Sequence, residues 1–83
     1  MSEDKIVIII SKLSIIGSDL TVPKNVRTNV KKAISALEEN GKEQNVKIDK
    51  ALEALSDVDN DPNIPSYTRS QIWGVISELE VQA

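Results

Sequence analysis

Apolar residues recur in four segments of the chain with the spacing of amphipathic helices. In residues 6–16, Ile6, Ile10 and Leu13 follow an i, i+4, i+7 pattern that places them on one helix face, with Ile9 and Ile16 beside them. The other three segments repeat this kind of pattern. Its residues are Val26, Val30, Ala33, Ile34 and Leu37 in the second segment, Ile48, Ala51, Leu52, Leu55 and Val58 in the third, and Ile72, Val75, Ile76 and Leu79 in the fourth. The pattern predicts four helices.

One segment favours a different structure when it is considered alone. Residues 5–10, KIVIII, are rich in β-branched side chains and have the propensity of a strand. Their counterpart at residues 47–52, KIDKAL, does not alternate as a strand would and suits a helix. We therefore predict a helix for both segments.

The second half of the chain resembles the first. A shift of 42 aligns residues 1–41 with residues 43–83, and 11 of the 41 pairs are identical. The identities fall at Lys5/Lys47, Ile6/Ile48, Leu13/Leu55, Ser14/Ser56, Asp19/Asp61, Pro23/Pro65, Arg27/Arg69, Ile34/Ile76, Ser35/Ser77, Leu37/Leu79 and Glu38/Glu80. Because repeats of this length usually form one supersecondary unit each, we predict a single domain over residues 1–83, an all-α four-helix bundle of two tandem helix-loop-helix repeats.

The most similar phrase lies in the loops, DLTVPKNVR from Asp19 and DPNIPSYTR from Asp61. Proline suits the first turn of a helix, and the residue before it is pushed into an extended conformation. We expect this aliphatic residue, Val22 or Ile64, to close the end of the bundle. We expect the aspartates, or Thr21 and Asn63, to accept free N–H groups of the next helix, and the arginines to bridge back to the aspartates. The predicted structural corner comprises Asp19, Pro23, Arg27, Asp61, Pro65 and Arg69.

Composition argues against most catalytic chemistry. The 83 residues include neither cysteine nor histidine, so disulfides, thiolate sites and the commonest general base are absent. Asp57, Asp59 and Asp61 resemble the start of a calcium loop, but Pro62 and Thr68 stand where that loop needs glycine and glutamate. Glu38/Glu39 and Glu78/Glu80 lie at helix ends with no sign of a shared cleft. We expect no enzyme, no metal and no cofactor.

The beginning of the chain and its charge bear on location and partners. MSEDKIVIII carries acidic residues where a secretory signal would be basic, and its apolar run is too short to span a bilayer. The net charge of −3 gives no general attraction to nucleic acid or anionic membrane. We expect a cytoplasmic protein without membrane contact.

Apolar residues outside the repeated stripe are candidates for a partner surface. Val7, Ile8 and Ile15 align with Asp49, Lys50 and Asp57 in the second half, so the first helix has an additional apolar face. This face either lies deeper in the bundle or meets another protein, which could be a second copy. Trp73, at the edge of the fourth stripe, either covers the core or anchors an interface.

A nucleic-acid partner is the alternative function. The second helix carries four basic residues that could contact phosphates, Lys24, Arg27, Lys31 and Lys32. The other interpretation is a solvated helix face, because the chain is acidic and no aromatic residues are interleaved. The alternative role is therefore an RNA- or ribosome-associated accessory protein, beside the leading hypothesis of a protein-interaction or self-association module.

The segments DLTVPKNVRTNVKKAISAL and DNDPNIPSYTRSQIWGVISELE resemble the two halves of a small archaeal family of unknown function, uncharacterised protein family 0147. The resemblance covers nearly the whole chain, and the first copy departs from it with Leu20 where the second has Pro62. It implies an all-helical four-helix bundle in an archaeal cytoplasmic protein. It implies no activity, cofactor or catalytic residue.

Overall fold

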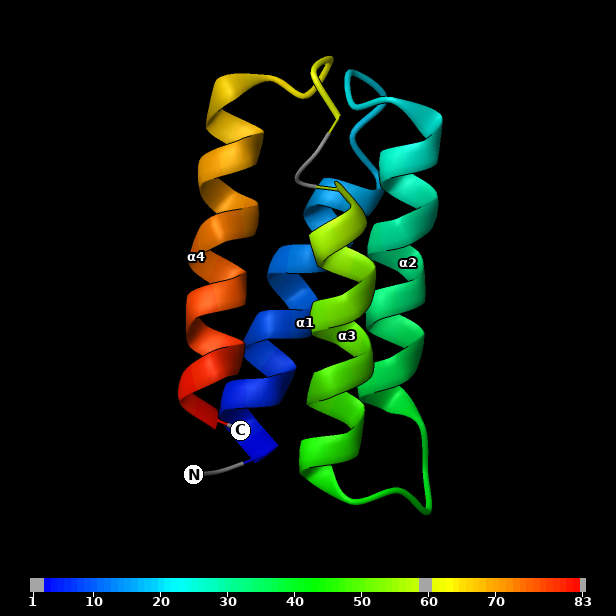
Figure 1. Cartoon of the computed structure of the whole chain (residues 1–83), viewed down its shortest axis with the longest axis vertical. Helices are drawn as coiled ribbons and strands as arrows, with labels where there is room; N and C mark the ends of the chain where they lie inside the picture. The colour runs from blue at the N-terminus through cyan, green and yellow to red at the C-terminus, as the bar shows by residue number, and fades with distance from the viewer. Residues whose placement is uncertain (1–2, 59–60, 83) are drawn as a thin grey trace.

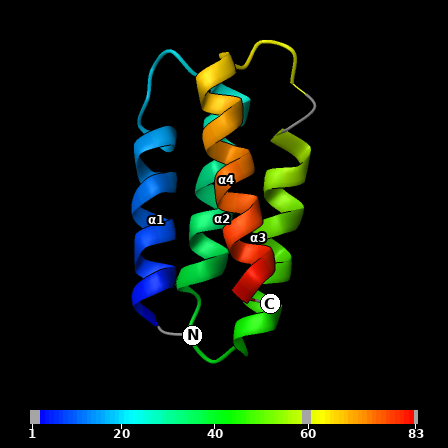
Figure 2. The ribbon, with the colours of Figure 1, turned by 90° about the vertical axis from the view of Figure 1, so that its left-hand side faces the viewer.

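A computed structural model describes residues 3–58 and 61–82 and shows four helices in one bundle (Figure 1). The helices are α1 (Glu3–Gly17), α2 (Lys24–Glu38), α3 (Gln44–Val58) and α4 (Ser66–Gln82). They run up and down in turn, and each packs against the helices before and after it, with α4 closing the ring on α1 (Figures 1 and 2). The predicted all-α four-helix architecture is confirmed, and residues 6–10 lie in α1 rather than in a strand.

The core of the bundle is made by one apolar stripe from each helix. The buried residues are Ile9, Leu13 and Ile16 of α1, Val26, Val30, Ala33 and Leu37 of α2, Ile48, Ala51, Leu55 and Val58 of α3, and Ile72, Val75 and Leu79 of α4. Val22 and Ile64 are also buried, so both loops close the end of the bundle as expected. Ile6, Ile10, Ile34, Leu52 and Ile76 pack around this core and are partly buried.

Burial follows the 42-residue repeat almost position by position. Leu13 and Leu55 are both buried, as are Leu37 and Leu79, and Val22 is matched by Ile64. Ile48 departs slightly, since its counterpart Ile6 is only partly buried. The two halves therefore contribute equivalent surfaces to one core, while the duplication that would explain them stays a prediction from the sequence.

Thr68 is a polar residue at a core position of α4. It is 1% exposed, and its hydroxyl has no hydrogen-bond partner among the described residues. The equivalent position in the first half is Val26, which is fully buried and has nearly the same shape. A buried hydroxyl without a partner costs about 1–3 kcal/mol relative to water. Thr68 is therefore a local weakness in the core.

We expect Thr68→Val to stabilise the protein by about 1 kcal/mol, because the substitution removes an unpaired hydroxyl and keeps the side-chain shape. Urea unfolding followed by circular dichroism measures the change. The matched control is Val26→Thr, which places the same hydroxyl in the first half and is expected to destabilise. A Thr68→Val protein that is less stable than wild type would show that the hydroxyl has a partner.

Candidate functional surfaces

The two corner loops lie at the same end of the bundle (Figures 1 and 2). Oδ1 of Asp19 accepts hydrogen bonds from the backbone N–H of Thr21, at 2.9 Å, and from its hydroxyl, at 2.6 Å. Oδ1 of Asp61 accepts the backbone N–H of Asn63 at 2.8 Å. Each aspartate thus closes its own loop as an Asx turn. Our expectation of a helix cap is wrong for α2, where Pro23 takes the capping position without a side-chain hydrogen bond.

The corner arginines bind backbone oxygens of the loops. Nε of Arg27 donates to the carbonyl oxygen of Val22 at 3.0 Å, and Nη2 of Arg69 donates to the carbonyl oxygen of Asp61 at 3.0 Å. We expected contacts with the aspartate side chains, whereas these two hydrogen bonds go to backbone carbonyl oxygens, those of Val22 and Asp61. The carbonyl of a buried residue such as Val22 needs a partner, and Arg27 supplies it.

The second oxygen of each aspartate is bound by the other half of the chain. Nδ2 of Asn25 donates to Oδ2 of Asp61 at 2.8 Å, and the Tyr67 hydroxyl donates to Oδ2 of Asp19 at 3.0 Å. Asn25 and Tyr67 occupy equivalent positions of the repeat, so the two bonds are reciprocal. The sequence did not indicate them, because asparagine and tyrosine share no obvious role. The corner therefore connects the two halves.

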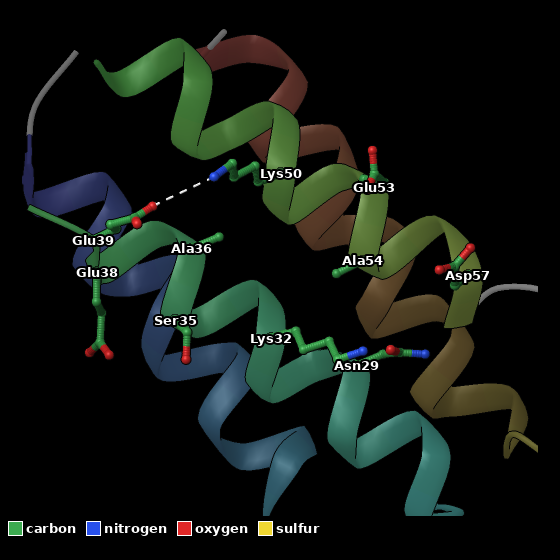
Figure 3. Close-up of a pocket in the computed structure, with 10 residues that line it drawn as sticks. All are labelled: Asn29, Lys32, Ser35, Ala36, Glu38, Glu39, Lys50, Glu53, Ala54 and Asp57. Atoms are coloured by element: carbon green, nitrogen blue, oxygen red, sulfur yellow. Dashed lines mark ion pairs between the residues drawn. The ribbon is translucent and has the colours of Figure 1, made fainter. Parts of the chain in front are cut away.

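An open polar groove of 620 Å³ lies between α2 and α3 (Figure 3). Nζ of Lys50 lies 3.9 Å from Oε1 of Glu39 across the groove. Figure 3 shows that Glu38, Glu53 and Asp57 extend without converging on one point. The groove is lined by Asn29, Lys32, Ser35, Ala36, Glu38, Glu39, Lys50, Glu53, Ala54 and Asp57. This arrangement is typical of a solvated charged surface.

Metal ligands do not gather in the part of the chain that the structure describes. Residues 3–58 and 61–82 contain no group of three acidic side chains placed to hold a metal ion. Asp59, the middle residue of the calcium-like sequence, lies outside the described residues.

The four basic residues considered for phosphate contact do not form one free surface. Arg27 is half-buried and bonded to the corner. Lys32 lines the α2–α3 groove together with carboxylates. Lys24 and Lys31 are exposed on the outer side of α2.

A smaller groove of 290 Å³ runs between α1 and α4. Its walls come from Lys12, Ile15 and Ile16 on α1 and from Gln71, Gly74, Val75 and Glu78 on α4. Nζ of Lys12 lies 2.6 Å from Oε1 of Glu78, so one ion pair spans the groove. Ile15 stands at its edge with 68% of its surface exposed.

The surface around this groove combines three exposed aliphatic side chains, Ile8, Ile15 and Val81, with small and polar residues. Ile8 is 47% exposed and lies near the side of Ile15, two turns earlier on α1. On α4, an i, i+4, i+7, i+11 row faces the same way. The residues of what we call the α1–α4 face are Ile8, Ser11, Lys12 and Ile15 of α1 and Ser70, Gln71, Gly74, Ser77, Glu78 and Val81 of α4. Lys12 and Glu78 of this face pair with each other, and Lys5, exposed three residues before Ile8 and seven before Lys12, lies on the same side of α1.

Val7 and Trp73, the other predicted interface residues, lie elsewhere. Val7 is 58% exposed and lines a separate depression with residues of α2 and α3, such as Leu37 and Lys47. Trp73 is 53% exposed and lies 100° around α4 from Gly74, one turn before Ser77, so it borders the α1–α4 face without belonging to the row of Gly74. The structure therefore brings together Ile8 and Ile15 but not all four residues.

Comparison with known proteins gives relatives of unknown function. The model of an uncharacterised protein family, UPF0147, matches residues 1–81. A UPF0147 protein of Methanocaldococcus jannaschii is 44% identical over 63 residues, 76% of this chain and 68% of the relative. One of Aeropyrum pernix is 38% identical over 79 residues, 95% of this chain and 87% of the relative. The crystal structure of the unknown-function protein MMP1188 covers 96% of this chain and 91% of its own, with 42% identity and a TM-score of 0.92. The resemblance stated from the sequence is confirmed.

The length and composition of the described helices decide whether one of them could cross a membrane. Within residues 3–58 and 61–82, none combines the length and the apolar composition that crossing a bilayer requires.

The corner predicts a dependence of stability on pH. Hydrogen bonds from Thr21, and then from Tyr67, lower the pKa of Asp19, and those from Asn63 and Asn25 lower the pKa of Asp61. A carboxylate whose pKa is lower in the folded protein than its unfolded value of 3.8 stabilises the folded state at pH values above 3.8. This contribution is lost as the pH falls through the pKa of the folded state. We expect urea stability to fall as pH drops below about 5, and to fall less steeply in Asp19→Asn plus Asp61→Asn. An equal pH slope in both proteins would contradict this account.

Proposed function

This chain belongs to the uncharacterised protein family UPF0147, which has no assigned function, and we propose that it is a non-enzymatic module that binds protein through its α1–α4 face. The observation that carries the proposal is the exposure of Ile8 and Ile15. Their repeat counterparts are Lys50 and Asp57, which are exposed and charged at equivalent positions. The fold therefore tolerates charge there, and the isoleucines serve something other than the core.

The opposite side of the bundle, formed by α2 and α3, is charged and so differs from the α1–α4 face. The exposed residues of α2 and α3 include eight charged side chains, Lys24, Lys31, Lys32, Glu38, Asp49, Lys50, Glu53 and Asp57. Exposed aliphatic side chains grouped on one side of an otherwise charged small protein are typical of a protein-binding site. The bundle core is complete without Ile8 and Ile15, so their exposed apolar area is available to a partner.

The charged groove between α2 and α3 gives less support for catalysis. Its titratable groups are lysines and carboxylates only, and these do not converge (Figure 3). A general acid or base is effective when it is held within hydrogen-bond distance of a reacting atom in a site that limits water. The open groove offers neither condition, and the family name indicates no reaction.

The proposal predicts loss of bound protein when the face becomes charged. We expect tagged Ile8→Lys plus Ile15→Lys, expressed in an archaeal host, to lose proteins that co-purify with the wild type, because lysine desolvation opposes burial of the face. Quantitative mass spectrometry measures the loss. The matched control is Leu20→Lys plus Val46→Lys, which places two lysines at exposed apolar positions outside the face and changes net charge equally, from −3 to −1.

Equal recovery of every bound protein with both double variants, together with the same oligomeric state in both, contradicts the proposal. A second assay addresses the nucleic-acid alternative, with total RNA in a gel shift at low salt. RNA binding that is lost in Lys24→Glu plus Lys31→Glu, and kept in Ile8→Lys plus Ile15→Lys, would favour that alternative over the present proposal.

A further inference from the structure

We infer that the partner of the α1–α4 face is a second copy of this chain, bound with α1 of each copy against α4 of the other. The inference rests on the proposed function and adds the identity and orientation of the partner. In this arrangement the two-fold axis runs along the bundles, so that each α1 lies antiparallel to the α4 it contacts. The same surface is used on both copies, as in most homodimers.

The shape of the face is complementary to itself. On α1 the exposed residues of the face include two bulky isoleucines, Ile8 and Ile15, seven residues apart. On α4 the row that faces the same way begins with three small residues, Ser70, Gly74 and Ser77. A Cβ added at Gly74 would meet nothing within 4 Å, so its small size leaves open space within the single chain.

The bulky residues of α1 and the small residues of α4 lie at matching heights along the axis of the bundle. Lys12 of α1 pairs with Glu78 of the antiparallel α4, so Ile15, three residues after Lys12, lies about level with Gly74 and Val75. Seven residues along a helix span about 10 Å, so Ile8 lies about level with Val81 on the antiparallel α4. A two-fold axis along the bundle keeps these levels, and it places each Ile15 over the partner's small row near Gly74.

Charge on the face selects the same orientation. When α1 packs against the α4 of the other copy, Lys12 of each copy faces the glutamate at position 78 of the other. The two lysines and the two glutamates then form one cluster without net charge. The alternative dimer packs α1 against α1 and α4 against α4. It sets Lys12 against its own equivalent, which is repulsive, and leaves the small row facing another small row.

The size of the face suits a weak to ordinary dimer. The bundle extends 34 by 19 by 19 Å, so two copies would have to contact each other over a whole long side, about 650 Å² in outline on each copy, to reach the lower end of the range for stable interfaces. Stable specific interfaces bury roughly 1,200–2,000 Å² in total.

Light scattering coupled to gel filtration tests the inference with purified protein. We expect the mass of two chains for the wild type, a shift to the mass of one chain for Ile8→Lys plus Ile15→Lys, and no shift for Leu20→Lys plus Val46→Lys. Circular dichroism and urea unfolding show whether each variant is folded. Gly74→Leu, which fills the space offered to Ile15, is a second variant expected to give a monomer.

Cysteine cross-linking tests the orientation, since the natural chain contains no cysteine. Ile15→Cys and Gly74→Cys are made in separate chains with different tags, mixed and oxidised. A disulfide needs Cα atoms within about 7 Å, so we expect a covalent heterodimer of these two chains and little homodimer of Ile15→Cys. Homodimer as the main product overturns the proposed orientation.

A wild-type protein that stays monomeric up to about 1 mM overturns the inference. If other proteins still co-purify in a manner that requires Ile8 and Ile15, the proposed function stands with a different partner. If nothing co-purifies in that manner, both the inference and the proposed function fail.

Discussion

Burial of one apolar stripe on each of the four helices is the interaction on which the rest of the structure depends. Helices of 15 to 17 residues are marginal alone in water, so their stability comes from packing against one another. The stripes of the two halves are equivalent, and they meet in one core with Thr68 as its single polar member among the described residues. This constraint fixes which sides of α1 and α4 face solvent, and therefore where a partner can bind.

The corner loops close one end of the bundle and join its two halves there. Val22 and Ile64 close one end of the bundle, and Arg27 and Arg69 bind loop carbonyl groups beside them. Asp19 and Asp61 then join each loop to the start of a helix in the other half. The two loops therefore lie at one end of the bundle, where reciprocal hydrogen bonds hold the halves together. The loop sequence in which the two halves resemble each other most therefore has a structural role.

The sequence predicted the fold well because the fold follows from helical periodicity and proline position. It predicted that Ile8 and Ile15 lie outside the stripe but could not decide their exposure, which depends on how the other three helices surround α1. It placed Trp73 in the same group, although Trp73 only borders the α1–α4 face. The reciprocal bonds of Asn25 and Tyr67 were not predictable, because they join residues 36 and 48 positions apart through differing side chains.

The central claim is that the α1–α4 face is open to solvent in one chain and covered by a second. Methyl NMR with a soluble paramagnetic agent measures this directly at several protein concentrations. The account predicts strong broadening of the Ile8 and Ile15 methyl signals in dilute protein and progressive protection as concentration rises, while Leu20 stays broadened throughout. Equal broadening of Ile8 and Ile15 at every concentration would contradict it.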